Sequence, residues 1–453
     1  MSDCLTTPSD AMIIQEPAPA EWSAQQVEEH VRKHARWNFI ANVMDVSFFS
    51  LATSFIFGAT VLSLYASYLT SSAVLIGLIA AIQSIGYTLP QLLTARKAEQ
   101  LDHKKSYVQK ISVMERIPYL FVPLGMLLWP EAPRWLSFII LAVSMAMATF
   151  AGGLASPAWN AMLAKVVAVH RRGLLFGLMR SIGGLMGIGG ALISRHVLAT
   201  YAYPTSFGIC FALCFLFQVA SFICLSLNRE PRQRPAKAPL GIVEYWRRLP
   251  GVLRGNPNFV RYLGSQALLI FGTMGVGFYI LYARQRFGIG DTFAADLTMA
   301  ALASQTLATP ILGWLADHRG HKWLSQVCAV IGAGALLTVL LAPSAFWLYV
   351  VFMLSNAAST GMAVANQGIT MEFGALDDLP TFVALAGTIS AVPIILAPLV
   401  GGWLVDLAGY HTLFIVALAF MGAGWVAMSR AVVEPRRRRK GSMGVSETDA
   451  MTA

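Results

Sequence analysis

The sequence predicts an all-α membrane protein with twelve transmembrane helices arranged as two six-helix bundles. Of its 453 residues, 56% are hydrophobic and only 12% are charged, whereas an ordinary soluble domain carries about 25% charged residues. The apolar residues gather in runs long enough to cross a bilayer, which takes about 20 residues. A basic, proline-containing segment divides these runs into two groups of six. Repeated membrane crossings therefore account for an apolar excess that a single water-soluble core does not.

The apolar runs predict the twelve spans in chain order. The first six are expected at 38–68, 74–94, 111–129, 135–156, 173–195 and 206–227. The second six are expected at 260–283, 293–315, 323–343, 346–371, 381–407 and 412–433. This pattern predicts an N-terminal bundle over 38–227 and a C-terminal bundle over 260–433.

Three polar segments flank the two predicted bundles. The N-terminal tail, 1–37, lacks the apolar core of a cleavable signal peptide, so we expect it to stay in the cytosol. The linker, 228–259, is basic and contains several prolines, and its part from Gly241 to Leu253 mixes apolar and basic residues as a short amphipathic helix does. The C-terminal tail, 434–453, carries a run of basic residues suited to anionic lipid or to anchoring the topology.

The basic residues predict the orientation in the membrane. Of the 33 lysines and arginines, 26 fall in the segments on the side of the two termini and only 4 in the opposite loops. Lysine and arginine are retained on the cytoplasmic side of membrane proteins. We therefore expect a multi-pass protein of the inner (plasma) membrane with both termini cytoplasmic. The net charge of +10 does not indicate a nucleic-acid partner, because the basic residues lie in short strips between apolar runs.

The most specific motif lies between spans 8 and 9. The stretch from Gly313 to Lys322 reads GWLADHRGHK. It resembles the signature loop of the major facilitator superfamily, G-x-L-A-D-x-x-G-x-K, and more generally this chain resembles the bacterial exporters of that superfamily. The resemblance implies two bundles around one central site, and a contact that closes the cytoplasmic side while the site faces outward.

The residues of this loop are candidates for that cytoplasmic gate. Gly313 would let a neighbouring helix approach closely, and Gly320 suits a tight reversal. Arg319 and Lys322 would hold the inner side, and Asp317 would face the positive N-terminal end of span 11 or a basic residue. The alternative is an ordinary inner loop whose charges only set the topology.

The corresponding loop between spans 2 and 3 departs from the pattern. It reads QLLTARKA over 91–98, with Ala95 in the aspartate position and neither glycine. The sequence therefore does not predict an equivalent gate contact in the first half.

Two stretches resemble bacterial exporters of the superfamily. Span 5 is rich in glycine, like the corresponding helix of drug/proton antiporters, although it lacks the proline of their motif. Close helix packing explains these glycines equally well. The segment from Ser156 to Asn160 also resembles a stretch that many of these exporters carry at this place.

Three ionisable side chains within the first six spans are candidates for proton coupling. Asp45, Arg116 and Arg180 all lie on the order of 10 Å from the predicted inner ends, at 1.5 Å per helical residue. A carboxylate that binds a proton in one state and an arginine in the other would couple proton and solute movement. A permanent ion pair between Asp45 and either arginine is the alternative.

Two further acidic residues receive structural roles. Glu115 is expected to brace span 3 together with Arg116. Glu372, at the end of span 10, is expected to meet inner basic groups such as Arg171 and Arg172 and so to belong to the cytoplasmic gate.

The polar groups of the second bundle are neutral. Gln266, Gln305 and Asn356 are candidates for binding a solute's hydroxyl or carbonyl groups, with Phe49 contributing an aromatic wall from span 1. Hydrogen bonding between helices is the alternative for each polar group.

The predicted function is secondary transport of a small organic solute by alternating access, through proton-coupled export. Uptake or facilitated diffusion of a sugar or neutral metabolite is the alternative within transport. An intramembrane enzyme, a sensor or a lipid flippase is a remote one. The motifs of ATP binding, zinc proteases and serine hydrolases are missing from the sequence. The expected partners are a small-molecule substrate, the bilayer and protons, with no cofactor, no metal and no nucleic acid.

Overall fold

The computed structural model describes residues 22–129, 131–168, 171–231, 251, 253–373 and 379–434. Within these ranges all regular secondary structure is helical, and turns or irregular residues join the helices. The predicted amphipathic helix at 241–253 and the basic C-terminal run lie outside the described residues, apart from 251 and 253.

The first six spans are built from α1 to α8. The helices are α1 (Ala24–Ser54), η1 (Gly58–Leu62), α2 (Ser63–Leu69), α3 (Ala73–Gln100), α4 (Lys104–Arg116), η2 (Ile117–Leu120), α5 (Phe121–Leu128), α6 (Arg134–Val166), α7 (Arg172–Thr200) and α8 (Thr205–Ser226). The first span runs through α1, η1 and α2, and the third through α4, η2 and α5. These helices pack into the N-terminal half of the molecule.

The second six spans repeat this plan. The helices are α10 (Pro257–Gly272), η4 (Val276–Phe278), α11 (Tyr279–Phe287), α12 (Thr292–Arg319), α13 (His321–Leu341), α14 (Trp347–Glu372) and α15 (Leu379–Ala431). Eleven helices of the described chain are long and apolar enough to cross a membrane. The last of them bends at Gly409, whose φ of 81° ends one helix and starts the next. The predicted twelve spans in two six-helix bundles are therefore confirmed.

The first helix starts before the predicted first span. α1 begins at Ala24, inside the segment expected to be an N-terminal tail. Ser23 and Gln26 form a reciprocal capping box at that end, and such a box fixes a helix start regardless of hydropathy. The apolar pattern locates the membrane-crossing part and misses the polar turns before it.

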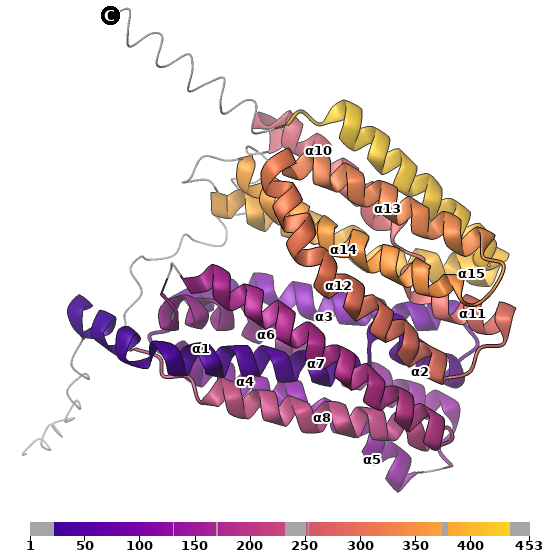
Figure 1. Ribbon diagram of the computed structural model, residues 1–453, viewed down its shortest axis with the longest axis horizontal. Coiled ribbons are helices and arrows are strands. Elements are labelled where there is room, and N and C mark those ends of the chain that lie inside the picture. The colour runs from indigo at the N-terminus through magenta and orange to yellow at the C-terminus, as the bar shows by residue number, and fades with distance from the viewer. Residues whose placement is uncertain are drawn as a thin grey trace, which may run out of the picture.

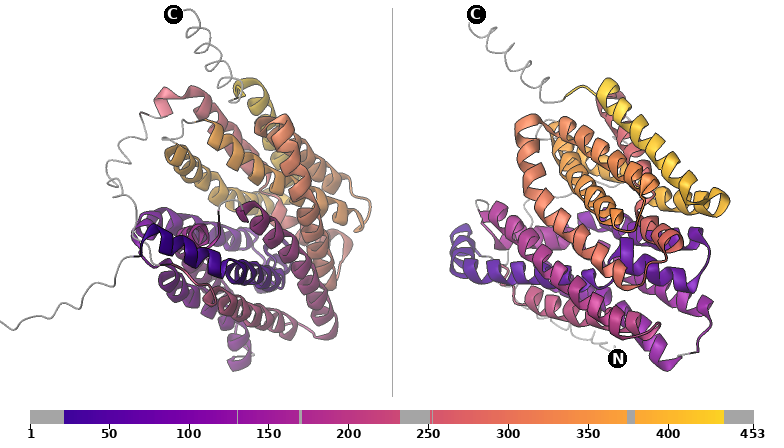
Figure 2. Two further views of the ribbon diagram at one scale, coloured as in Figure 1. Left: turned by 60° about the vertical axis from the view of Figure 1, so that its left-hand side comes forward. Right: turned by 45° about the vertical axis from the view of Figure 1, so that its right-hand side comes forward.

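The two halves converge at one side of the molecule. Figure 1 shows the N-terminal half below the C-terminal half, meeting where α2 and α11 lie, and both views of Figure 2 agree. We call this the far side, and the opposite side, where α1 and α10 begin, the near side. α3 packs on α15 and α7 packs on α12 across the boundary between the halves.

Each half is closed by the same asparagine clamp between its first and last helices. Asn38 on α1 binds the backbone of Arg229, accepting from its N–H at 2.8 Å and donating to its carbonyl at 3.1 Å. Asn258 on α10 binds the backbone of Val433 in the same way, at 2.7 and 2.8 Å. The two bundles are therefore related in their hydrogen bonds as well as in their helix order.

A carboxylate follows each clamp. Glu230, after Arg229, is buried and accepts hydrogen bonds from the backbone N–H groups of Lys104 and Lys105 at the start of α4, at 3.1 and 2.7 Å. Glu434, after Val433, lies against Gly320 at the start of α13, 3.2 Å from where a Cβ would stand. An acidic group at a helix N-terminus offsets the positive end of the helix dipole.

Candidate functional site

A central cavity of about 260 Å³ lies between the two halves. The N-terminal half lines it with residues of η1, α2 and α3, and the C-terminal half with residues of α10, η4 and α15. The lining residues are Gly58, Ala59, Ser63, Ile76, Gly77, Ala80, Gln83, Ile270, Thr273, Met274, Val276, Gly277, Phe278, Ile394, Ala397 and Pro398.

The first helix of each half is irregular where it meets this cavity. α1 ends at Ser54 and continues as the π-helical turn η1, while α10 ends at Gly272 and continues through the 3₁₀ turn η4. Single π turns in helices are frequent at functional sites. Interrupted helices at corresponding places of two repeats are the best sequence-readable pointer to a transporter's binding site.

Neutral polar groups are spread over an otherwise apolar lining. The Ser63 hydroxyl donates to Gly58 O and that of Thr273 to Ile270 O, both at 2.7 Å, so each oxygen retains acceptor capacity. Gln83 makes its hydrogen bond to a weak acceptor, Met145 Sδ, at 3.7 Å. None of the lining residues carries a charge. The cavity suits an uncharged, partly apolar solute.

The residues expected to bind substrate lie elsewhere. Gln305, Asn356 and Phe49 are partly exposed and do not line the central cavity. Asn356 donates to Phe352 O of its own helix at 2.9 Å. Gln266 is only 2% exposed, lies one helical turn before Ile270, and has a buried Oε1 without a hydrogen-bond partner in the described chain.

Gln83 is the lining amide that sequence reasoning missed, beside the hydroxyl groups of Ser63 and Thr273. Its signal was an amide within an apolar run, the same signal that selected Gln266 and Gln305. Which amide faces the space between the halves depends on how the two bundles pack, and hydropathy does not contain that information.

A buried charged cluster in the N-terminal half joins two of the three predicted proton-coupling residues. Ser221 on α8 donates to Asp45 Oδ1 at 2.7 Å and accepts from Arg116 NH2 at 3.0 Å. Trp159 Nε1 lies 3.4 Å from Asp45 Oδ2. Arg116 also pairs with Glu115 at 3.1 Å. Asp45 and Arg116 are each 5% exposed, so a serine bridges them inside the bundle.

Two polar groups of the N-terminal half were not anticipated in their positions. Arg180 lies on an exposed face of α7 and forms no ion pair with Asp45 in the described chain, so the expected meeting of all three groups is wrong for Arg180. Gln218 is fully buried, and neither polar atom of its side-chain amide has a partner among the described residues. Its backbone carbonyl accepts from Arg116 Nε at 2.8 Å.

The signature loop forms the near-side turn from α12 to α13. Gly320 has φ of 96° and ends α12, as expected for a tight reversal. Lys322 Nζ donates to Ser429 O at 3.3 Å, Arg319 lies over the Trp323 ring at 4.9 Å, and Asp317 is exposed. These contacts of Lys322 and Arg319 stay within the C-terminal half.

One expectation for this region does not match the structure. A Cβ on Gly313 would meet nothing within 4 Å, so no helix of the described chain packs closely there. Glu372 Oε1 pairs with His321 Nδ1 at 2.8 Å, within its own half, and its contact with the inner arginines stays a prediction. Ala95 of the first-half loop has no described side chain.

The far side is closed by polar contacts between the halves. The Tyr68 hydroxyl reaches both oxygens of Asp291 at 2.8 Å, and Arg284 lies over the Tyr68 ring at 4.2 Å. Arg195 pairs with Asp296 at 2.7 Å. The hydroxyls of Thr60 and Thr298 form a further hydrogen bond between the halves, at the inner edge of this closure.

Asp406, the last polar group of the far-side closure, caps a helix of the other half. Its carboxylate accepts from the N–H groups of Ala73 and Val74, at 2.8 and 3.1 Å, and from the Ser72 hydroxyl at 2.8 Å. Gly402 and Gly77 bring the two backbones together, because a Cβ on Gly402 would stand 2.5 Å from Ala73 O.

The described residues contain no group of three or more histidine, cysteine or acidic side chains that could hold a metal ion. The arrangement offers a neutral cavity between the two halves, contacts that close one side, and a buried charged cluster within the N-terminal half.

Comparison with known proteins places these features in a family. The sequence profile of the Major Facilitator Superfamily matches residues 46–295 and 262–449. Monocarboxylate transporter 12-B of Danio rerio is 24% identical over 195 residues, and the match spans 41% of this chain and only 41% of that protein.

Solved structures share the fold at low sequence identity. A mutant of the nucleoside transporter NupG has a TM-score of 0.67 at 12% identity, covering 86% of this chain and 98% of that one. The xylose transporter XylE from E. coli, partially occluded and inward open, has a TM-score of 0.65 at 13% identity, covering 90% and 98%. An inward-facing bacterial homologue of the lysosomal transporter Spinster has a TM-score of 0.62 at 14% identity, covering 91% and 97%.

Proposed function

Because the chain belongs to the major facilitator superfamily and is a transporter, not an enzyme, we propose that it exports a small uncharged organic solute through the central cavity in exchange for protons. The neutral, largely apolar lining between the interrupted first helices of the two halves supports an uncharged solute. A charged solute would leave its charge without a partner in this cavity, at a cost of several kcal/mol.

The structure represents the state that is open on the near side under this proposal. The far side is held by the contacts of Asp406 with the start of α3, of Asp291 with Tyr68 and of Asp296 with Arg195, all between the halves. The near-side contacts of Lys322 and Arg319 stay within the C-terminal half. Closing the near side would bring the signature loop, with Asp317, toward the N-terminal half. The excess of basic residues on that side supports its assignment as the cytoplasmic side.

The buried cluster supplies the proton site of the proposal. Asp45 and Glu115 are two carboxylates served by one guanidinium: Arg116 pairs directly with Glu115 and reaches Asp45 only through Ser221, and no cation lies within 4 Å of Asp45 in the described chain. An uncompensated buried charge is costly, so a bound proton would neutralise the excess carboxylate. Loss of that proton would leave Asp45 charged beside the Ser221 bridge and favour a different packing of α1 against α8.

Uptake or facilitated diffusion of a sugar or another neutral metabolite is the second candidate. It is favoured by the hydroxyl and amide groups of Ser63, Gln83 and Thr273, which can hydrogen-bond to a hydroxyl-rich solute. The structural neighbours named for xylose and nucleosides show the fold only. A sugar and a nucleoside therefore belong in the panel of solutes to be tested.

The test is solute-driven proton movement in proteoliposomes. Purified protein is reconstituted with a pH-sensitive dye inside, and amphipathic drugs, xylose and uridine are added in turn. Wild type is compared with Asp45→Asn and with Asp102→Asn, an exposed near-side carboxylate that serves as the control. Proton flux that disappears only in Asp45→Asn supports coupling through the cluster. Solute uptake without proton flux would overturn coupling and leave facilitated diffusion.

The same vesicles test the central cavity. Gln83→Leu should raise the KM of the transported solute by roughly 2- to 12-fold, the equivalent of one hydrogen bond of about 0.5–1.5 kcal/mol. Gln305→Leu is the matched control, because Gln305 does not line the cavity. An effect of Gln305→Leu with none of Gln83→Leu would move the site away from this cavity.

A further inference from the structure

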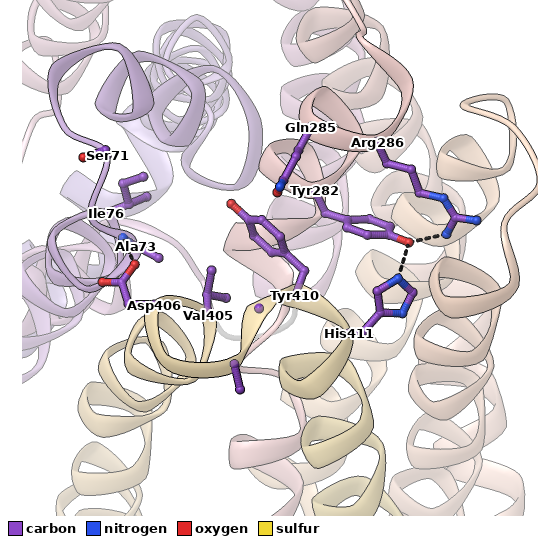
Figure 3. A pocket seen from close by; sticks show the side chains of 12 residues that line it. Ser71, Ala73, Ile76, Tyr282, Gln285, Arg286, Val405, Asp406, Tyr410 and His411 are labelled. Atoms are coloured by element: carbon purple, nitrogen blue, oxygen red, sulfur yellow. Dashed lines mark hydrogen bonds between the residues drawn. The ribbon is translucent and has the colours of Figure 1, made fainter.

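A second cavity, on the far side, is larger than the central one. It has a volume of about 850 Å³ and lies between the start of α3 and the segments around α11 and Gly409. Figure 3 shows Tyr282, Gln285, Arg286 and His411 on one side of it and Ser71 on the other. We infer that this far-side cavity binds an amphipathic organic anion, with Arg286 as the residue that recognises its carboxylate.

The wall of the far-side cavity carries one arginine, Arg286, and one carboxylate, Asp406. Arg286 is exposed and pairs with no carboxylate within 4 Å in the described chain. The one acidic residue of the wall, Asp406, already accepts three hydrogen bonds at the start of α3. Its charge is therefore offset by the helix N-terminus, and the wall as a whole presents an uncompensated positive group.

Arg286 is held in place by a buried partner. Its NH1 donates to the hydroxyl of Tyr282, whose side chain is only 4% exposed, and its guanidinium lies over the Tyr282 ring at 5.6 Å. Tyr282 packs edge-on against His411 and Phe414, and its hydroxyl lies 3.5 Å from His411 Nε2. A guanidinium has five N–H donors in a fixed fork, so donors remain for a carboxylate.

The apolar part of the wall selects an amphipathic ligand. Tyr410, Val405 and Ile76 line the same cavity, and its volume lies within the range of about 300–1,000 Å³ that is typical of small-molecule sites. An aromatic carboxylate combines a group for Arg286 with a surface for these side chains. A bulky fully polar anion would leave them uncovered.

The far-side cavity is separate from the central cavity. Ile76, 7% exposed, is the one lining residue that the two cavities share. Since the walls come from both halves, a bound ligand would stabilise the far-closed state and slow transport. Only this consequence rests on the proposed alternating access, and the binding step does not.

The experiment is calorimetric titration of the full-length protein in nanodiscs with 1-naphthoate, with empty nanodiscs subtracted and 1-naphthamide as the neutral probe of the same shape. We expect naphthoate to bind wild type and Arg286→Gln to weaken that binding at least tenfold, with naphthamide binding weakly to both. Arg261→Gln, which removes an exposed near-side arginine, and Gln83→Leu should leave naphthoate binding unchanged.

Two outcomes would overturn the inference. Naphthoate affinity that is the same in Arg286→Gln, with an unchanged melting temperature, would show that Arg286 does not recognise the anion. Affinity lost in Gln83→Leu would place the anion in the central cavity. Failure of the proteoliposome assay alone would contradict the proposed transport and leave the far-side site intact, because the titration does not depend on solute movement.

Discussion

Asp406 Oδ1 accepts a hydrogen bond from the backbone N–H of Ala73 at 2.8 Å, so the end of a helix in one half caps the start of a helix in the other. The contact combines charge, helix dipole and two further hydrogen bonds at a place where the halves must separate if the far side opens. It is therefore the closing contact whose removal is simplest to interpret.

Asp406→Asn should shift the protein toward the far-open state. Removal of the charge costs about 1 kcal/mol at a helix N-terminus, or roughly a fivefold change in population. The measurement is the rate at which an impermeant maleimide, added on the far side, labels Ser63→Cys in a background without the native cysteines. Glu131→Gln, an exposed acidic residue in the loop between α5 and α6, is the control and should label like the parent. Equal rates in all three would show that Asp406 does not hold the closure.

Gly402→Ala should open the far side by steric repulsion. A Cβ at this position would meet the backbone of Ala73 at 2.5–2.8 Å, and backbone atoms cannot move aside alone. The same labelling assay should therefore show faster modification, and the melting temperature should fall, since overpacking typically costs about 1–3 kcal/mol. Gly422→Ala, in the helix after the Gly409 bend and with nothing within 4 Å, should leave both quantities unchanged or slightly raise the stability.

Ser221→Ala should destabilise the N-terminal half. The Ser221 hydroxyl is the bridge between Asp45 and Arg116, and its loss leaves buried charged groups with one partner fewer. The expected cost is about 1–3 kcal/mol, read as a lower melting temperature in nanodiscs. Ser144→Ala is the matched control, because that buried hydroxyl bonds only to Ile140 O of its own helix in the described chain. A melting temperature for Ser221→Ala that equals that of the control would contradict the bridge.

Asn38→Ala and Asn258→Ala should have equivalent effects in different halves. Each removes two side-chain hydrogen bonds to the backbone just after the last helix of its bundle, at a cost of about 1–3 kcal/mol. Hydrogen exchange should rise at the helix ends of the mutated half and not in the other. Asn160→Ala, which loses a bond within one exposed helix turn, is the control, and a rise spread over both halves would contradict two independent clamps.

The fold was predictable because hydropathy and charge act along the chain. Spans of about 20 apolar residues and a basic linker identify two groups of six without any knowledge of contacts. Hydropathy does not locate the polar ends of helices. The start of α1 at Ala24, for example, depends on a capping box between Ser23 and Gln26. Gly320 and Asp45 could be singled out from the sequence because each residue type has a local requirement. A tight reversal needs glycine, and a buried charge needs a partner.

The candidate site was less predictable because it depends on how two bodies meet. Gln83 and Gln266 are equivalent in sequence terms, yet only Gln83 lines the central cavity. Asp45 and Arg116 were expected close together from their depth, whereas the angular position of Arg180 around its helix places it on an exposed face. Asp406 had no distinguishing signal, because its partners are backbone N–H groups of a distant helix.

The paired asparagine clamps also bear on how this chain can be divided. Each bundle is closed between its own first and last helices by Asn38 with Arg229 or by Asn258 with Val433, and neither closure uses a residue of the other half. The peptide connection across 232–250 is then dispensable for closing either bundle. Two genes, one ending and one beginning within that stretch, should therefore yield fragments that each complete their own ring of helices and meet afterwards in the bilayer, as subunits do.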